Sequence, residues 1–179
     1  DLDNPLTRRA YEELSEEVAQ QFSSIPVKVE VFEGTGEPYA NSREMRQDVL
    51  QNNHLYIYKT IPSTFGPEGT DFSSHPLLAD SKFTDINGVP LLYNDLFRAV
   101  HDYLAHNIST AEFGPKGEEA AWKNHMAVTN SPWARWALTT ETRGQNSWVN
   151  YRSDLAPDTP IADRPFAEQK TALLPLHYS

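Results

Sequence analysis

The stretch LLYNDLFRAVHDYLAHN, residues 91–107, decides the fold, because its apolar residues recur at helical spacing while polar, proton-handling residues interrupt them. The pattern predicts a helix near residues 92–107, with Asn94 or Asp95 as its N-cap. Polar groups are unusual in a segment that otherwise resembles core, so the same stretch also raises the question of function.

Further helices are expected downstream of this stretch. GPKGEEAAWKNHMAV predicts one near residues 116–129, with a proline in the first turn and two early glutamates, both favourable there. SPWARWALTTETRGQNSWVNY predicts another near residues 133–151, opened by Ser131 and Pro132. RPFAEQKTALL, residues 164–174, predicts a short last helix.

Residues 1–60 combine helices with short strands. NPLTRRAYEELSEEVAQQFSS predicts a helix with Thr7 as its N-cap, and NSREMRQDVLQNN predicts a second helix capped by Asn41 or Ser42. VKVEVF and HLYIYKT read as short strands, so these elements suggest a small α/β unit. Residues 61–90 are rich in Pro, Gly, Ser and Asp and predict a long loop.

Together these segments predict a single α+β domain, residues 1–179, that is mostly helical. A C-terminal helical bundle, residues 91–179, carries the polar helix faces, and a small strand-bearing part, residues 1–60, precedes it. The composition agrees with an ordinary globular domain, since 39% of the residues are hydrophobic and 22% are charged.

Charge and cysteine usage exclude several classes of function. The formal net charge of −10 argues against a nucleic-acid partner and against an acidic membrane surface, because both require clustered Lys and Arg. The absence of cysteine excludes a disulfide scaffold, a thiolate zinc site and a cysteine nucleophile. No apolar run approaches the roughly 20 residues of a membrane span, and no signal peptide is visible, so we expect a cytoplasmic protein.

The three helices after residue 90 each carry a carboxylate on an otherwise apolar or aromatic face. Helical spacing joins each carboxylate to a second polar residue: Asp102 to His106, Glu118 to His125 and Glu141 to Gln145. Buried carboxylates and imidazoles are costly unless paired, so converging faces would need a divalent cation. Imidazole with carboxylate suits iron, manganese or zinc, and helical bundles hold such ions. The candidate ligands are His101, Asp102, His106, Glu118, His125 and Glu141.

Three more polar residues are candidates for catalysis beside such an ion. Glu119 is a candidate base, and Arg143 and Gln145 are candidates for orienting a small polar or anionic substrate. Arg143 lies two residues from both Glu141 and Gln145, so it faces the ion only if Gly144 breaks the helix. We expect that break, because glycine costs about 1 kcal/mol relative to alanine inside a helix.

Each of these residues also has an ordinary structural interpretation. The histidines can bond to backbone carbonyls, the glutamates can stabilise a helix N-terminus, and Arg98 can pair with Asp102 at the surface. A closed hydrogen-bond network of such groups would fix the helix register without catalysis.

Four blocks, PLLYNDLFRAVHDYLAH, FGPKGEEAAWKNH, ALTTETRGQNSWVNY and FAEQKTALLP, occur in this order. They resemble the successive motifs of an uncharacterised domain family of bacteriophage and phage-related bacterial proteins, over about residues 75–176. The resemblance implies a phage-associated protein, alone or within a large phage polypeptide, acting in the host cytoplasm. It brings no catalytic assignment, and Ala105 stands where relatives carry Gly.

Three functional hypotheses follow. The first is a non-heme iron or manganese enzyme that carries out oxidative chemistry on a small substrate. The second is a metal-dependent nucleotide phosphohydrolase, since VHDYLAH resembles the His-Asp core of the HD phosphohydrolases, with His54 or His75 and Asp154 as further ligands. The third is a non-enzymatic virion or host-interaction module. The sequence leaves the oligomeric state open.

Overall fold

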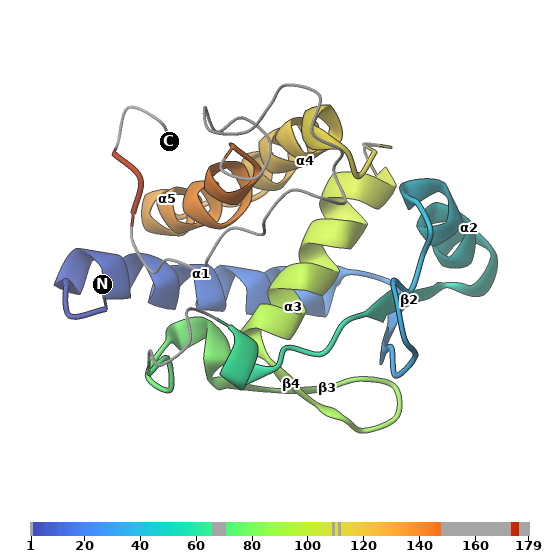
Figure 1. Ribbon diagram of the computed structural model, residues 1–179, viewed down its shortest axis with the longest axis horizontal. Helices are drawn as coiled ribbons and strands as arrows, with labels where there is room; N and C mark the ends of the chain where they lie inside the picture. Colours follow the sequence, from blue (N-terminus) through green and yellow to red (C-terminus); the bar gives the residue numbers. More distant parts are fainter. Residues whose placement is uncertain (1, 66–70, 109, 111, 148–172, 176–179) are drawn as a thin grey trace.

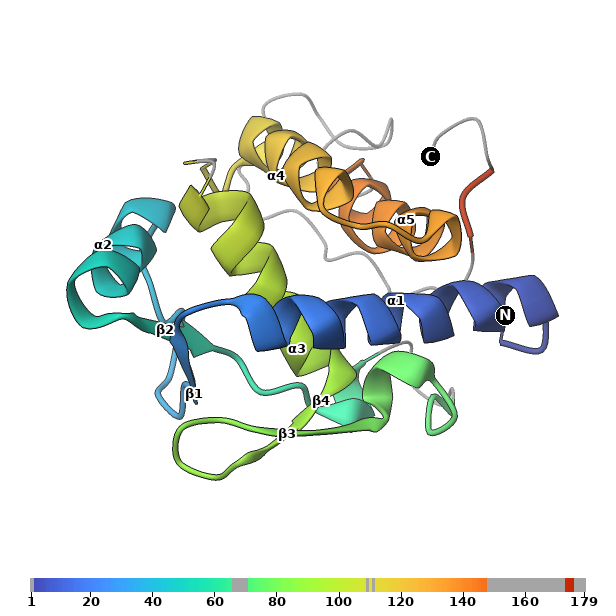
Figure 2. The same ribbon diagram turned by 180° about the vertical axis from the view of Figure 1, so that it is seen from behind.

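The computed structural model describes residues 2–65, 71–108, 110, 112–147 and 173–175. Over these residues the protein is α+β and mostly helical, as the sequence predicts. Helix α1 (Pro5–Ser24) runs along the molecule, and α3 (Tyr93–Val100) crosses it (Figures 1 and 2). Helices α4 (Pro115–Ala127) and α5 (Pro132–Thr139) lie on one side of α1.

The predicted α/β unit is confirmed. Strands β1 (Lys28–Val31) and β2 (His54–Ile57) are parallel, and α2 (Ser42–Asn52) connects them. Helix α2 begins after Asn41, whose side-chain oxygen accepts a hydrogen bond from the Glu44 backbone N–H at 3.0 Å. Asparagine is favoured at this position because its side chain satisfies one of the free N–H groups of the first turn.

Two other helices begin before the N-cap residues that the sequence predicts. Asn4, and not Thr7, caps α1, and Thr7 is buried inside the helix. Helix α3 begins directly after Leu92, so Asn94 and Asp95 lie inside its first turn and are not the N-cap. The Asp95 carboxylate nevertheless accepts the Leu92 N–H at 2.8 Å, which gives it the hydrogen bond that a capping residue would make from outside the helix.

The region 61–90, predicted as a long loop, contains a β-hairpin. Strand β3 (Asp80–Thr84) pairs antiparallel with β4 (Pro90–Leu92), and two short 3₁₀ turns precede it, Pro62–Thr64 and Pro76–Leu78. The loop prediction is wrong because strands this short show little alternation between the turn-forming residues around them.

Two buried carboxylates connect the hairpin and the parallel strands to the helices. Asp85, in the hairpin turn, accepts the Val31 backbone N–H of β1 at 3.0 Å. Asp95 is fully buried and accepts from the Lys59 ammonium at 2.8 Å and from the Thr60 backbone N–H at 2.6 Å. These bonds fix the start of α3 against the chain that leaves β2.

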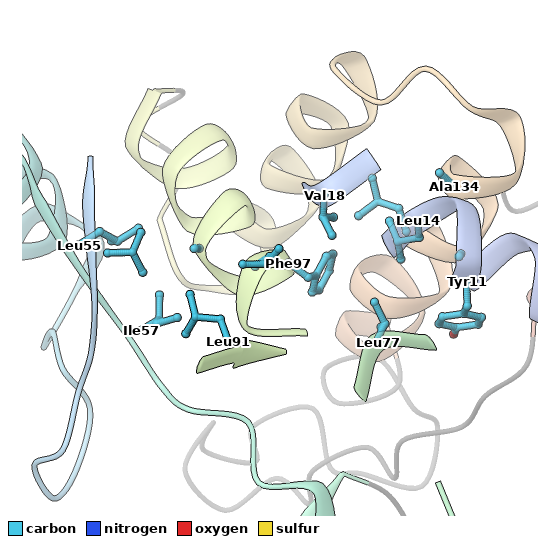
Figure 3. Close-up of a cluster of buried hydrophobic side chains, with 14 of the residues drawn as sticks. Tyr11, Leu14, Val18, Leu55, Ile57, Leu77, Leu91, Phe97 and Ala134 are labelled. Atoms are coloured by element: carbon cyan, nitrogen blue, oxygen red, sulfur yellow. The ribbon is translucent and has the colours of Figure 1, made fainter. Parts of the chain in front are cut away.

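The main hydrophobic core lies where α1 meets α3, α5 and the strands (Figure 3). Its buried residues come mainly from α1, α2, α3, α5 and the parallel strands, and they include Tyr11, Leu14, Val18, Leu55, Ile57, Leu77, Leu91, Phe97 and Ala134. Because α1 contributes a whole face to this core, α3 and α5 pack against it, and α4 packs in turn against α5 and against the segment that follows α3.

Two of the C-terminal helices change their winding. After α3 the chain continues as a π-helical segment, η3 (His101–Ile108), and α5 continues as a second one, η4 (Thr140–Gly144). In a π-helix each N–H bonds to the carbonyl five residues earlier instead of four. The break expected at Gly144 is wrong, since the helix widens there and continues to Ser147.

The rest of the predicted helix near 133–151, and almost all of the one over 164–174, falls outside the described residues; the described residues 173–175 are not helical. Within the described part of the chain, no helix has the length and apolar character needed to cross a membrane.

Candidate metal centre

Three of the predicted ligands converge at one point. His101 and His106 come from η3, and Glu118 comes from the first turns of α4. One ligand atom of each residue lies within 4.8 Å of the other two. His101 Nε2 is 3.4 Å from Glu118 Oε2, and His106 Nε2 is 3.2 Å from Glu118 Oε1. This group of two imidazoles and one carboxylate could hold a metal ion.

The π-helical winding brings the two histidines together. His101 and His106 are five residues apart, and on an α-helix they would point about 140° away from each other. On η3 their rings are in edge contact, with centroids 5.1 Å apart. α-Helical spacing pairs His106 with Asp102 instead, so the residue types were predicted from the sequence but their grouping was not.

Asp102 lies beside this group and not in it. It is half-buried, and burial raises the pKa of its carboxyl, as does the nearby Glu118 carboxylate. The neighbouring His101 and His106 act in the opposite direction and favour the ionised form. Asp102 is therefore an acidic neighbour of the centre that keeps its proton to a higher pH than an isolated surface aspartate.

Glu118 is the exposed member of the group. Burial acts to raise the pKa of its carboxyl, but hydrogen bonds and charge from His101 and His106 lower it to about 2. Its side chain is 31% exposed, whereas that of His106 is 1% exposed. The centre thus combines an ionised carboxylate at its solvent side with a buried imidazole behind it.

Two phenylalanines hold the imidazole rings in place. Phe97 of α3 stacks on His101, with ring centroids 6.0 Å apart and planes inclined by 28°. Phe113, which precedes α4, meets the His106 ring edge-on at 5.0 Å. Because aromatic contacts restrict ring rotation, both nitrogens that face Glu118 are oriented before any ion binds.

His125 of α4 lies directly behind His101. Its Nδ1 is 3.4 Å from His101 Nδ1, and its Nε2 is 3.1 Å from Gln21 Oε1. It is fully buried, and burial, with the nearby His101, lowers the pKa of its imidazole to about 3, so the ring is neutral. Both of its nitrogens have protein partners, and its role as a ligand of the same ion stays a prediction.

Glu141 has other partners. Its Oε1 accepts a hydrogen bond from the Tyr11 hydroxyl at 2.5 Å, and its Oε2 accepts from Gln145 Nε2 at 3.2 Å. Burial, and then the Glu141 charge, raises the pKa of Tyr11. The spacing that predicted contact between Glu141 and Gln145 is confirmed, but in the described residues Glu141 is not a member of the group at His101.

The two remaining candidates pair with each other. Arg143 Nε is 3.3 Å from Glu119 Oε2, and the guanidinium lies 4.6 Å from the centre of the Trp122 ring. Both charged side chains are about one-third exposed. Arg143 is thus held over α4 by a partly exposed ion pair and a cation–π contact.

The further ligands that an HD-type centre would need lie elsewhere. The two ring nitrogens of His54 contact Asp48 and Glu30 at 2.7 and 2.8 Å. His75 is buried, and its Nδ1 accepts a backbone N–H. Neither histidine belongs to the group at His101, and Asp154 is outside the described residues.

Sequence reasoning missed Gln21 and the two phenylalanines. Phe97 precedes His101 by four residues, so its place on the same helical face was a usable signal. Gln21 is separated from His125 by 104 residues, and nothing in its local sequence distinguishes it from the neighbouring Gln20.

No protein-family model matches the sequence, and no curated protein or solved structure matches it either. The resemblance to a phage-associated family therefore stays a prediction, and the function is inferred from the geometry.

Proposed function

We propose that this chain is a non-heme metal enzyme whose ion is held by His101, His106 and Glu118. One observation carries the proposal, the convergence of two imidazole nitrogens and one carboxylate oxygen at one point. Two histidines and one carboxylate are the ligand set typical of non-heme iron(II) oxygenases, which keep other coordination positions open. Iron is the favoured metal, with manganese next and zinc as the competitor that accepts the same ligand types.

The spacing of the donor atoms supports an ion at this point. Two ligand atoms that each lie about 2.1 Å from an ion are about 3.0–3.4 Å apart when their bonds make angles of about 90–110°. His101 Nε2 is 3.4 Å from Glu118 Oε2 and His106 Nε2 is 3.2 Å from Glu118 Oε1, so each imidazole lies at this spacing from one oxygen of the carboxylate, and one ligand atom of each residue lies within 4.8 Å of the other two. The carboxylate is ionised, so its charge offsets part of the charge of a cation.

The surroundings fit an ion that is reached from one side. His106 is buried under Phe113, whereas Glu118 faces solvent. A bound ion would supply open coordination positions on that side, for dioxygen or for substrate. The substrate class we propose is small and polar or anionic. An anionic group would compete with Glu119 for the guanidinium of Arg143.

Metal binding is the first test. The full chain, freed of metal by chelation and titrated with iron(II) under anaerobic conditions, should bind about one equivalent. Glu118→Gln keeps the shape of the side chain but removes its charge, so it should lower the affinity at least about 10- to 100-fold. Nitric oxide, read by electron paramagnetic resonance, then probes for an open position on the bound iron.

Glu16→Gln is the matched control, because Glu16 is an exposed glutamate of α1. It should bind iron as the unchanged chain does. Equal affinity in the Glu118 and Glu16 variants would contradict the proposal. So would a chain that binds none of iron, manganese or zinc.

A further inference from the structure

We infer that Gln21 and His125 fix the proton of His101 on Nδ1, so that His101 Nε2 is the atom that binds the ion. The inference rests on the proposed metal centre and adds two positioning residues to it. Neither residue need touch the ion. They act on the ion indirectly, through two hydrogen bonds in series, one from His125 to Gln21 and one from His101 to His125. We call this series the relay.

The first step is the orientation of the Gln21 amide. Its Nε2 lies 3.2 Å from the Val128 carbonyl oxygen and 3.3 Å from Thr129 Oγ1. A backbone carbonyl only accepts, so the NH₂ group of Gln21 must point to it. The Thr129 hydroxyl donates to the His125 carbonyl at 2.9 Å, which leaves its oxygen free to accept. Gln21 Oε1 therefore faces His125.

The second step is the proton on His125. An amide oxygen only accepts, so the contact of 3.1 Å to Gln21 requires that His125 Nε2 carries the proton. His125 is fully buried, where a charged imidazole is disfavoured. A neutral imidazole carries one proton, and His125 Nδ1 is therefore an acceptor.

The third step transfers this restriction to His101. His101 Nδ1 is 3.4 Å from His125 Nδ1, and since the latter accepts, His101 Nδ1 must donate. Its Nε2, which faces Glu118, is then the only nitrogen of this ring that can offer a lone pair to an ion. Histidine ligands of metals usually donate their other ring N–H in this way, and the partner that receives it fixes both the tautomer and the ring direction.

Phe97 makes the relay rigid. Its ring stacks on His101 and also on His125, with the second pair of planes inclined by 24° and their centroids 5.9 Å apart. Rotation of either imidazole would break this stacking together with the hydrogen bond. The end of α1 is thereby connected to the ion through three side chains.

Nitrogen-15 NMR of the imidazole rings reads the relay directly. In the full chain loaded with zinc(II) above about pH 8, where an ordinary histidine is neutral and the ion takes the place of the proton between His101 Nε2 and Glu118, His101 should carry its proton on Nδ1 and His125 should carry its proton on Nε2. Cobalt(II) is the affinity probe, followed by its visible absorption. Gln21→Met keeps the length of the side chain but has no acceptor oxygen, and it should lower cobalt affinity about 10- to 100-fold.

Two further variants test whether this loss of affinity comes from the missing acceptor oxygen. Gln21→Glu keeps an acceptor for His125 Nε2 but loses the donor to the Val128 carbonyl oxygen, so it should recover only part of the cobalt affinity that Gln21→Met loses. Gln20→Met makes the same change at an exposed neighbour on α1 and should have no effect. A general loss of packing would not be rescued by the glutamate and would not change the tautomers.

The outcomes separate the relay from the centre itself. If the unchanged chain binds cobalt but His101 carries its proton on Nε2, the relay is overturned and the centre stands. Equal cobalt affinity of Gln21→Met and the unchanged chain overturns the relay as well. If the unchanged chain binds no cobalt, iron or zinc, the proposed function is overturned, whatever tautomers the two rings adopt. Should Gln21→Met fail to fold, the tautomers of His101 and His125 in the unchanged chain still test the relay.

Discussion

Replacing His75 with asparagine should remove a pH dependence of folding that the structure assigns to one proton. The His75 side chain is 1% exposed, and its Nδ1 accepts the Leu77 backbone N–H at 3.1 Å, a bond that an asparagine oxygen can also accept. Its Nε2 has no hydrogen-bond partner among the described residues, and the His75 ring makes edge-to-face contacts with the rings of Tyr11 and Phe65. Burial, with a contribution from Arg8, lowers the pKa of His75 from 6.5 to about 4.

The sign of the effect follows from where the proton binds. Between pH 6.5 and about pH 4 the unfolded chain binds a proton at His75 and the folded chain does not, so stability falls as the pH falls. Above pH 6.5 nothing is lost, and below about pH 4 the loss is complete. At about 1.4 kcal/mol for each pH unit between 6.5 and about 4, the full loss is about 3–4 kcal/mol.

Urea unfolding followed by tryptophan fluorescence, at a series of pH values across this window, measures the effect as the difference between His75→Asn and the unchanged chain. The lost ring contacts lower the stability of the variant by an amount that does not depend on pH. His125, whose pKa is lowered to about 3, titrates in both chains and cancels. The difference should shrink by about 3–4 kcal/mol as the pH falls through the window. Parallel curves would refute the reasoning.

Two further predictions concern the starts of α3 and α4, the helices next to the candidate site. Asp95→Ala should destabilise the fold by about 3–5 kcal/mol, measured by chemical unfolding, because it removes the buried partner of Lys59; a loss below about 1 kcal/mol would contradict this. Gly117→Ala should be destabilising by about 1–3 kcal/mol, because an added Cβ would come within 1.7 Å of the Glu112 carbonyl oxygen. Gly114→Ala is its control, since nothing lies within 4 Å there, and equal melting temperatures for the two variants would argue against the close approach.

Much of the fold could be predicted because its elements carry local signals. Proline in the first turn located α4 and α5, and Asn41 located α2. The hairpin of β3 and β4 was hidden because its strands are short and sit among turn-forming residues. Its pairing depends on contacts from elsewhere, such as the bond between Asp85 and β1, which no local pattern contains.

The candidate site was predicted in its residue types but not in its grouping. Carboxylate and imidazole on apolar helix faces pointed to His101, His106 and Glu118 among a larger set. Which members meet depends on the winding of η3, and a change from four- to five-residue bonding leaves no mark in the hydrophobic pattern. Gln21 could not be found at all, since its role comes from the docking of α1 alone.

The position of the ligands along the chain has a consequence for the order in which the protein assembles. His101 and Glu118 are 17 residues apart, so closing that loop loses little chain entropy and can occur early. The contact between Gln21 and His125 spans 104 residues and forms only after α1 has docked. On a ribosome α1 is synthesised first, yet it can contact His125 only after the chain has been synthesised beyond that residue, 104 residues after Gln21. A young chain would thus bring its three candidate ligands together before it acquires the residue that we propose fixes the tautomer of His101, and a metal ion bound early would be held loosely until the fold closes.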